Sequence, residues 1–196
     1  MRVWRKTCRT KMCLGLLNVV ISVLLVPLPS LAQNTATATQ TLQATIFPLG
    51  GLFTQASQIS LTKTSTSFNG FSGTMTLNYR ARTTQGMGQG TITVKATADF
   101  MPAGGPSIST PPSAGDKFTY TCSGASLGSS CSGTQTVSTT TATTVISVGA
   151  SACTGGGAPC STADPNSANV TFILTDDPKY KTGSYSATLT WTISAS

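Results

Sequence analysis

Apolar and polar residues alternate along several separate stretches of this chain, and this period of two is the strongest structural evidence in the sequence. The clearest stretches span residues 35–46, 75–82, 92–100, 118–122, 170–174 and 185–193. Successive side chains of a strand point to opposite faces, so each stretch predicts a strand that gives one face to a core. No stretch sustains the three- and four-residue spacing that an amphipathic helix requires.

Gly, Pro and Asn residues separate these stretches. The turn-forming segments are 48–51, 69–70, 86–90, 102–106, 111–112 and 176–183. Shorter alternating stretches at 59–63 and 145–148 predict two more strands. About eight short strands with such connections predict an all-β fold, an immunoglobulin-like antiparallel β-sandwich, with a barrel as the alternative. The stretches 74–82 and 90–100 are expected to form a hairpin across residues 86–90.

The first 32 residues are typical of a secretory signal peptide. Five basic residues precede an apolar run from Leu14 to Val26, and Ser30-Leu31-Ala32 provides a small-residue cleavage site after Ala32. A membrane anchor is the alternative, but this run has 13 residues, whereas a helical span needs about 20. We therefore expect residues 33–196 to form a single domain that is secreted or on the cell surface, with no membrane span after cleavage.

Removing the leader changes the charge balance. The full chain carries 12 basic and 5 acidic residues, but five of the basic ones lie in the leader, so the remainder has a net charge of +2. A nucleic-acid-binding domain would show clustered Lys and Arg, and no such cluster is present, so no nucleic-acid partner is expected. Disorder is a further alternative, but disordered chains usually combine low hydrophobicity with high charge.

Four cysteines remain after the leader: Cys122, Cys131, Cys153 and Cys160. In an exported chain they predict two disulfides, for which three connectivities exist. Cys122–Cys131 and Cys153–Cys160 are favoured, because each pair brackets a Gly/Ser-rich stretch that can turn back on itself. A zinc site is the alternative, but these pairs lack the short spacing of such sites. The loops around 101–169 are expected to be irregular.

Catalytic chemistry has few candidates in this sequence. The chain has no His and no Glu, so it lacks an ordinary Ser–His pair and His-ligated metal. Asp176-Asp177 is the one adjacent acidic pair, and it fits a turn before Pro178 better than a calcium site. We expect neither an enzyme nor a cofactor.

If 74–82 and 90–100 form a hairpin, Arg80, Arg82 and Lys95 share its outer face, either as a small basic patch or as protection against edge pairing.

The C-terminal segment 180–193 resembles the closing strand of secreted pilus subunits of the chaperone–usher class, in particular spore-coat-U-like subunits. Gly183 is followed by Tyr185 and then by alternating Thr and apolar residues, and the segment 35–46 resembles the donor segment of these proteins. The resemblance implies an incomplete immunoglobulin-like fold that a neighbour's N-terminal strand completes. It assigns Ala36, Ala38, Leu42, Ala44 and Ile46 to the donor strand. It assigns Gly183, Tyr185, Leu189, Trp191 and Ile193 to the acceptor strand, where a chaperone would also bind.

The sequence therefore predicts an exported structural or adhesive protein of the cell surface, a pilus-like subunit assembled by strand exchange. Its expected partners are further copies or related subunits, and a periplasmic chaperone. The alternative is a self-contained secreted module that recognises a glycan or a protein through its irregular loops. The N-terminal segment separates the two hypotheses, because a donor strand exchanges between chains whereas the first strand of a module closes its own sheet.

Overall fold

A computed structural model describes residues 39–54, 57–65, 68–150, 152 and 165–196. The chain divides into two compact units, residues 1–43 and 44–196, and every strand among the described residues belongs to the second. The predicted signal peptide, residues 1–32, lies outside the described residues. In the first unit the described residues 39–43 are exposed and in no strand.

The described residues contain ten strands and no helix, which confirms the all-β prediction. The strands are β1 (Leu49–Thr54), β2 (Thr62–Lys63), β3 (Phe71–Arg82), β4 (Gly90–Met101), β5 (Thr119–Ser123), β6 (Ser129–Ser130), β7 (Gln135–Thr136), β8 (Thr143–Val148), β9 (Asn166–Leu174) and β10 (Ser186–Ala195). Within this part of the chain, no helix is long and apolar enough to cross a membrane.

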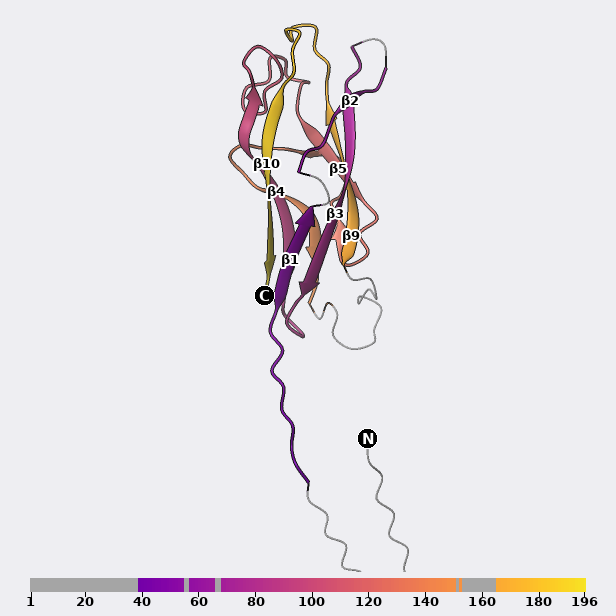
Figure 1. Cartoon of the computed structure of the whole chain (residues 1–196), viewed down its shortest axis with the longest axis vertical. Helices are drawn as coiled ribbons and strands as arrows, with labels where there is room; N and C mark the ends of the chain where they lie inside the picture. Colours follow the sequence, from indigo (N-terminus) through magenta and orange to yellow (C-terminus); the bar gives the residue numbers. More distant parts are fainter. Residues whose placement is uncertain (1–38, 55–56, 66–67, 151, 153–164) are drawn as a thin grey trace, which may run out of the picture. The chain divides into compact units, whose positions relative to one another are not determined.

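The strands form two antiparallel sheets (Figure 1). The first sheet has the order β1-β3-β9-β5-β7, and β2 also pairs with β3. The second has the order β10-β4-β8-β6. The predicted hairpin of β3 and β4 is therefore wrong, because these consecutive strands belong to different sheets. Alternation could not reveal this, since a strand shows one apolar face to a shared core from either sheet.

The inward-facing residues of both sheets form one hydrophobic core. Tyr79, Tyr120 and Phe172 are the largest of its fully buried side chains. The Phe172 ring stacks on the Phe118 ring with centroids 5.4 Å apart, and Phe118 meets Phe100 edge-on at 5.4 Å. Burying an apolar side chain of this size contributes about 1.5–3 kcal/mol, so these inward positions account for much of the stability.

The outward faces of both sheets carry mostly hydroxyl groups. Hydroxyl side chains meet across neighbouring strands, with oxygen–oxygen distances of 2.9 Å for Thr74–Thr171, 2.9 Å for Thr91–Ser194 and 3.0 Å for Thr97–Thr190. Thr fits a pleated, half-buried surface because its β-branched side chain packs against its neighbours. The alternating Thr residues of the sequence are therefore the solvent side of the strands.

A disulfide ties the two sheets together at one edge. Cys122 of β5 is bonded to Cys131, which follows β6, and their Cα atoms are 5.3 Å apart. This pairing is the one predicted from the sequence. The loop between these cysteines is also held by Tyr79, whose hydroxyl donates to the Leu127 carbonyl and accepts from the Leu127 amide. The second predicted pair, Cys153 and Cys160, lies outside the described residues.

The stretch 35–46 was expected to be a strand, but its described residues 39–46 are in no strand. Two further predictions of local structure also differ from the structure. The segment 48–51 was expected to turn, yet β1 begins at Leu49 and pairs with β3 from Arg82 to Leu77. In the stretch 59–63, only Thr62 and Lys63 form a strand. Pairing with β3 explains why Gly50 and Gly51 lie in a strand, because a tertiary partner can override the local preference of glycine for turns.

Candidate functional site

The last strand is covered less than the other long strands of the structure. On β4, the inward-facing residues Ile92, Val94 and Ala96 are 0%, 0% and 1% exposed. On β10 the inward-facing residues are only half-buried. They are Ala187, Leu189, Trp191, Ile193 and Ala195. Among the described strands β10 pairs with β4 alone, so its other edge leaves backbone groups without a strand partner.

Strand β1 covers one end of the half-buried inward face of β10. It lies between β10 and the part of β3 that leads to Arg82 (Figure 1). Its Gly50 is so close to Ile193 that an added Cβ would lie 3.2 Å from the Ile193 Cγ1 atom. Glycine at this position therefore lets β1 approach β10 closely. A groove lies beside the rest of β10.

We call this opening the β10 groove. It has a volume of about 850 Å³ and is lined by apolar residues of both sheets, among them Phe71, Met75, Phe172, Leu189 and Trp191. The Trp191 ring meets the Phe172 ring edge-on with centroids 6.3 Å apart. An apolar groove that borders an unpaired strand edge is suited to an extended peptide, which gains both backbone hydrogen bonds and side-chain pockets.

The wall opposite β10 includes a segment that bulges out of its sheet. Strands β1 and β2 pair with the same edge of β3, at Thr54↔Leu77 and Thr62↔Ser72. Four residues of β3 separate Leu77 from Ser72, whereas the opposite segment is longer and includes the described residues 57–61. Ile59 and Leu61 are half-buried, pack against the core and line the groove.

Gly73 of β3 makes room for this bulge. An added Cβ there would lie 2.7 Å from the Ser60 carbonyl oxygen and 2.9 Å from a Leu61 methyl carbon. A side chain at this position would therefore push the wall of the groove outward.

The end of the groove near β2 is polar. The Lys63 Nζ lies 3.0 Å from an Asp176 carboxylate oxygen. The Asp177 carboxylate accepts hydrogen bonds from the Lys179 amide and the Ser113 hydroxyl, each at 2.7 Å. These hydrogen bonds, that of Ser113 first, lower the pKa of Asp177. The contacts agree with the interpretation of Asp176-Asp177 as a turn. The part of the chain that the structure describes contains no group of three Cys or Asp residues that could hold a metal ion.

Two more titratable groups lie beside this turn. Burial, and then the neighbouring Asp177, raises the pKa of Asp116, which is 3% exposed. Burial, and then the charges of Asp116, Asp177 and Asp176, raises the pKa of Tyr180 to about 12. The Tyr180 hydroxyl is buried and has no hydrogen-bond partner among the described residues. This end of the groove therefore holds a tyrosine that stays protonated at neutral pH.

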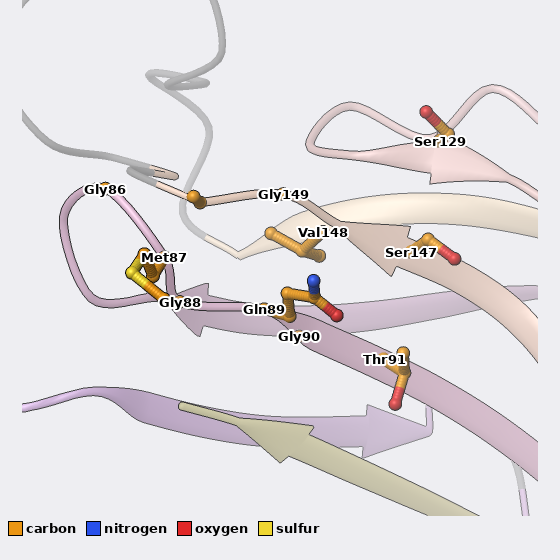
Figure 2. Close-up of a pocket in the computed structure, with 11 residues that line it drawn as sticks. Gly86, Met87, Gly88, Gln89, Gly90, Thr91, Ser129, Ser147, Val148 and Gly149 are labelled. Atoms are coloured by element: carbon orange, nitrogen blue, oxygen red, sulfur yellow. The ribbon is translucent and has the colours of Figure 1, made fainter.

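A second, shallower depression lies at the turn between β3 and β4. Figure 2 shows Gly86, Met87 and Gly88 curving beside Val148 and Gly149, with the hydroxyls of Thr91, Ser129 and Ser147 nearby. Its volume is about 620 Å³. None of the described residues that line it titrates near neutral pH. It therefore offers no group for acid–base catalysis.

The acceptor residues chosen from the sequence lie mostly together. Gly183, Tyr185, Leu189 and Trp191 line the β10 groove, whereas Ile193 lies at its closed end against β1. The groove residues of the facing wall, such as Ile59 and Met75, were not singled out from the sequence. Their alternation marks them as inward-facing, but nothing local marks them as uncovered.

The donor residues chosen from the sequence are not part of any strand where they are described. Ala36 and Ala38 lie outside the described residues. Leu42 is 94% exposed and Ile46 is 71% exposed, and Ala44 is also exposed. Of the proposed basic patch, Arg80 and Arg82 lie on β3 in one sheet and Lys95 on β4 in the other, so the three do not form the patch expected from the hairpin.

Comparison with known protein families finds no match to this chain, and comparison with curated proteins finds none either.

Proposed function

We propose that this protein is an exported structural subunit of the cell surface that assembles by strand exchange. Residues 36–46 of one copy fill the β10 groove of the next. In this proposal the two sheets form an immunoglobulin-like sandwich, and a neighbour supplies one of its edge strands. The observation that carries the proposal is the half-buried inward face of β10, next to an edge that pairs with no other described strand.

The N-terminal segment has the pattern that the groove requires. Its apolar residues occupy even positions from 36 to 46, with Gln at position 40, and its odd positions hold Thr or Gln. In an extended chain the even positions share one face, about 6.6 Å apart along the strand. That face can enter the groove while the Thr residues face water. The described residues 39–48 are exposed and in no strand, which is the state expected of a strand that is given to another chain.

Backbone pairing supplies the second part of the binding energy. A strand that lies along β10 satisfies the amide and carbonyl groups of its edge, and its apolar side chains cover Leu189 and Trp191. A single copy leaves the edge and the inward face of β10 partly exposed. A periplasmic chaperone could therefore bind a subunit there before it assembles. An adhesive role would follow from the surface of such a fibre.

The direct test replaces donor residues by Asp in the chain that begins at Gln33. Leu42→Asp and Ile46→Asp each place a charge in an apolar groove, which costs several kcal/mol unless the strand stays out. Sizing and electron microscopy should show oligomers or filaments for the unmodified protein and monomers for both variants. Thr41→Asp and Thr45→Asp are matched controls, because they put the same charge on the opposite face and should still assemble.

A different result would reject strand exchange. If the unmodified chain stays monomeric at high concentration, the groove is not filled by residues 36–46 of another copy. The protein would then be better described as a self-contained module that binds a glycan or a protein.

Export is the other part of the proposal, and it has its own test. The tripartite leader supports it, and the Cys122–Cys131 disulfide suits an oxidising compartment. The intact mass of the protein recovered from its host should correspond to a chain that begins at Gln33. A mass that includes Leu14 to Val26 would contradict cleavage.

A further inference from the structure

Large apolar side chains are exposed on the outer side of the sheet at the point where the N-terminal segment joins it. Phe47 is 70% exposed, Leu49 is 50% exposed and Phe53 is 44% exposed. Together with Arg80 and Arg82 of β3, these residues define what we call the β1 patch. Large apolar side chains that are exposed close together on one face of a soluble protein can mark an interaction site.

The register of β1 on β3 brings these side chains together. Leu49 pairs with Arg82, and Phe53 pairs with Asn78, so their side chains lie on the same outward face as Arg80 and Arg82. Gly51 stands between them, where an added Cβ would be 3.7 Å from the Phe53 ring. This opening lets the Arg80 guanidinium lie 4.9 Å from the centroid of that ring. Arg82 Nε donates a 2.9 Å hydrogen bond to the Phe47 carbonyl, which ties the start of the patch to β3.

We infer that the β1 patch is a second contact surface between neighbouring copies, and that it contacts the neighbour beside the groove into which its own donor strand is inserted. This inference rests on the proposed function. Its partner is a second copy of this chain.

The length of the chain between the two sites supports this partner. The last donor residue, Ile46, is directly followed by Phe47, whose carbonyl is bound to Arg82 of its own sheet. One residue of extended chain spans at most about 3.6 Å. If Ile46 lies in the groove of a neighbour, that neighbour must therefore come within a few ångströms of Phe47. The exposed ring of Phe47 then lies where the two copies meet, and Leu49 and Phe53 extend the patch from this point along β1.

The composition of the patch also suits a protein surface. Aromatic residues and Arg are enriched in the cores of protein interfaces, and they often carry much of the binding energy. The Phe53–Arg80 pair is already ordered within one copy, so little side-chain freedom remains to be lost on contact.

The test compares two variants of the full mature chain with a matched control. Leu49→Ser and Phe53→Ser are combined in the first variant. Ile173→Ser is the control, because Ile173 is 41% exposed and lies on the outward face of the same sheet, on β9. Sedimentation gives the concentration at which half of each protein is assembled. We expect this concentration to rise at least tenfold for the double variant and to change less than twofold for the control.

Binding of a synthetic peptide of residues 36–46, measured below the assembly concentration, reports on the groove separately. It should be unchanged in all variants. If the double variant loses peptide binding through misfolding, Phe47→Ser decides instead, because Phe47 lies outside the strands and should also raise the assembly concentration. Assembly of the folded patch variants at the concentration of the unmodified protein would overturn the β1 patch alone. Failure of the unmodified protein to assemble would overturn both the patch and strand exchange.

Discussion

The Tyr79 hydroxyl is the part of the core whose removal gives the clearest test of the packing. Tyr79 is 0% exposed, and its hydroxyl both donates to the Leu127 carbonyl and accepts from the Leu127 amide, at 3.2 Å for the latter. Burial raises the pKa of Tyr79, so the hydroxyl remains a donor over the whole neutral range. Tyr79→Phe keeps the ring and removes both hydrogen bonds.

The cost follows from what Tyr79→Phe leaves behind. Leu127 is 2% exposed, so water cannot readily replace the lost partner of its amide or its carbonyl. Each buried polar group without a partner costs about 1–3 kcal/mol. We therefore expect the free energy of unfolding to fall by about 2–4 kcal/mol, which corresponds to about a 30- to 1,000-fold larger unfolded fraction.

Equilibrium unfolding in urea, with the disulfide intact, measures this loss. Tyr185→Phe is the matched control, because its hydroxyl donates to the Lys181 carbonyl at 2.6 Å in an exposed setting, where water can take its place. The control should lose less than about 1 kcal/mol. If Tyr79→Phe unfolds within 0.5 kcal/mol of the unmodified protein, about the resolution of such a measurement, Tyr79 does not hold the loop as described.

Three further changes test other parts of the structure. Asp99 accepts hydrogen bonds from Ile108, Ser109 and Ser107 that outweigh its burial and hold its pKa well below the ordinary value of about 3.9. The charged Asp99 carboxylate therefore stabilises the fold above about pH 4, and this contribution is lost as the pH falls further. The unfolding free energy of Asp99→Asn should thus decrease less between pH 4 and pH 2 than that of the unmodified protein. Gly73→Ala should cost about 2 kcal/mol in thermal unfolding, whereas Gly115→Ala, with no atom within 4 Å of its added Cβ, should cost less than about 1 kcal/mol. Replacing Cys122 and Cys131 by Ser should lower the unfolding free energy by about 2.5 kcal/mol, and an unchanged urea midpoint would show that the ring adds no stability.

The alternation of the sequence predicted most of the long strands but not how they pair. It identified the inward residues of β3, β4, β9 and β10, because burial on one face imposes a period of two. It did not assign β3 and β4 to different sheets, since Leu77 and Val94 need only reach a common core. Strand β1 was missed because Gly50 and Gly51 favour a turn locally, while pairing with β3 and contact with Ile193 favour a strand.

The candidate site was predicted on one side only. Tyr185, Leu189 and Trp191 were identified from the last strand, and they do line the groove. The opposite wall depends on a bulge opposite Gly73 and on the offset between β1 and β2. Such features arise from tertiary packing, so no local pattern around Ile59 indicates that its side chain lines an open groove.

The hydroxyl rows on the outer faces of the sheets form a part of the surface whose chemistry does not depend on pH or ionic strength. Ser and Thr side chains neither gain nor lose a proton over the pH range in which proteins fold. Salt has little to screen where charges are few. Acidification or a change of ionic strength therefore leaves the chemistry of rows such as Thr91–Ser194 and Thr74–Thr171 unaltered. A partner that binds these faces would therefore find the same pattern of hydrogen-bond donors and acceptors in fresh water, in brine or in acid.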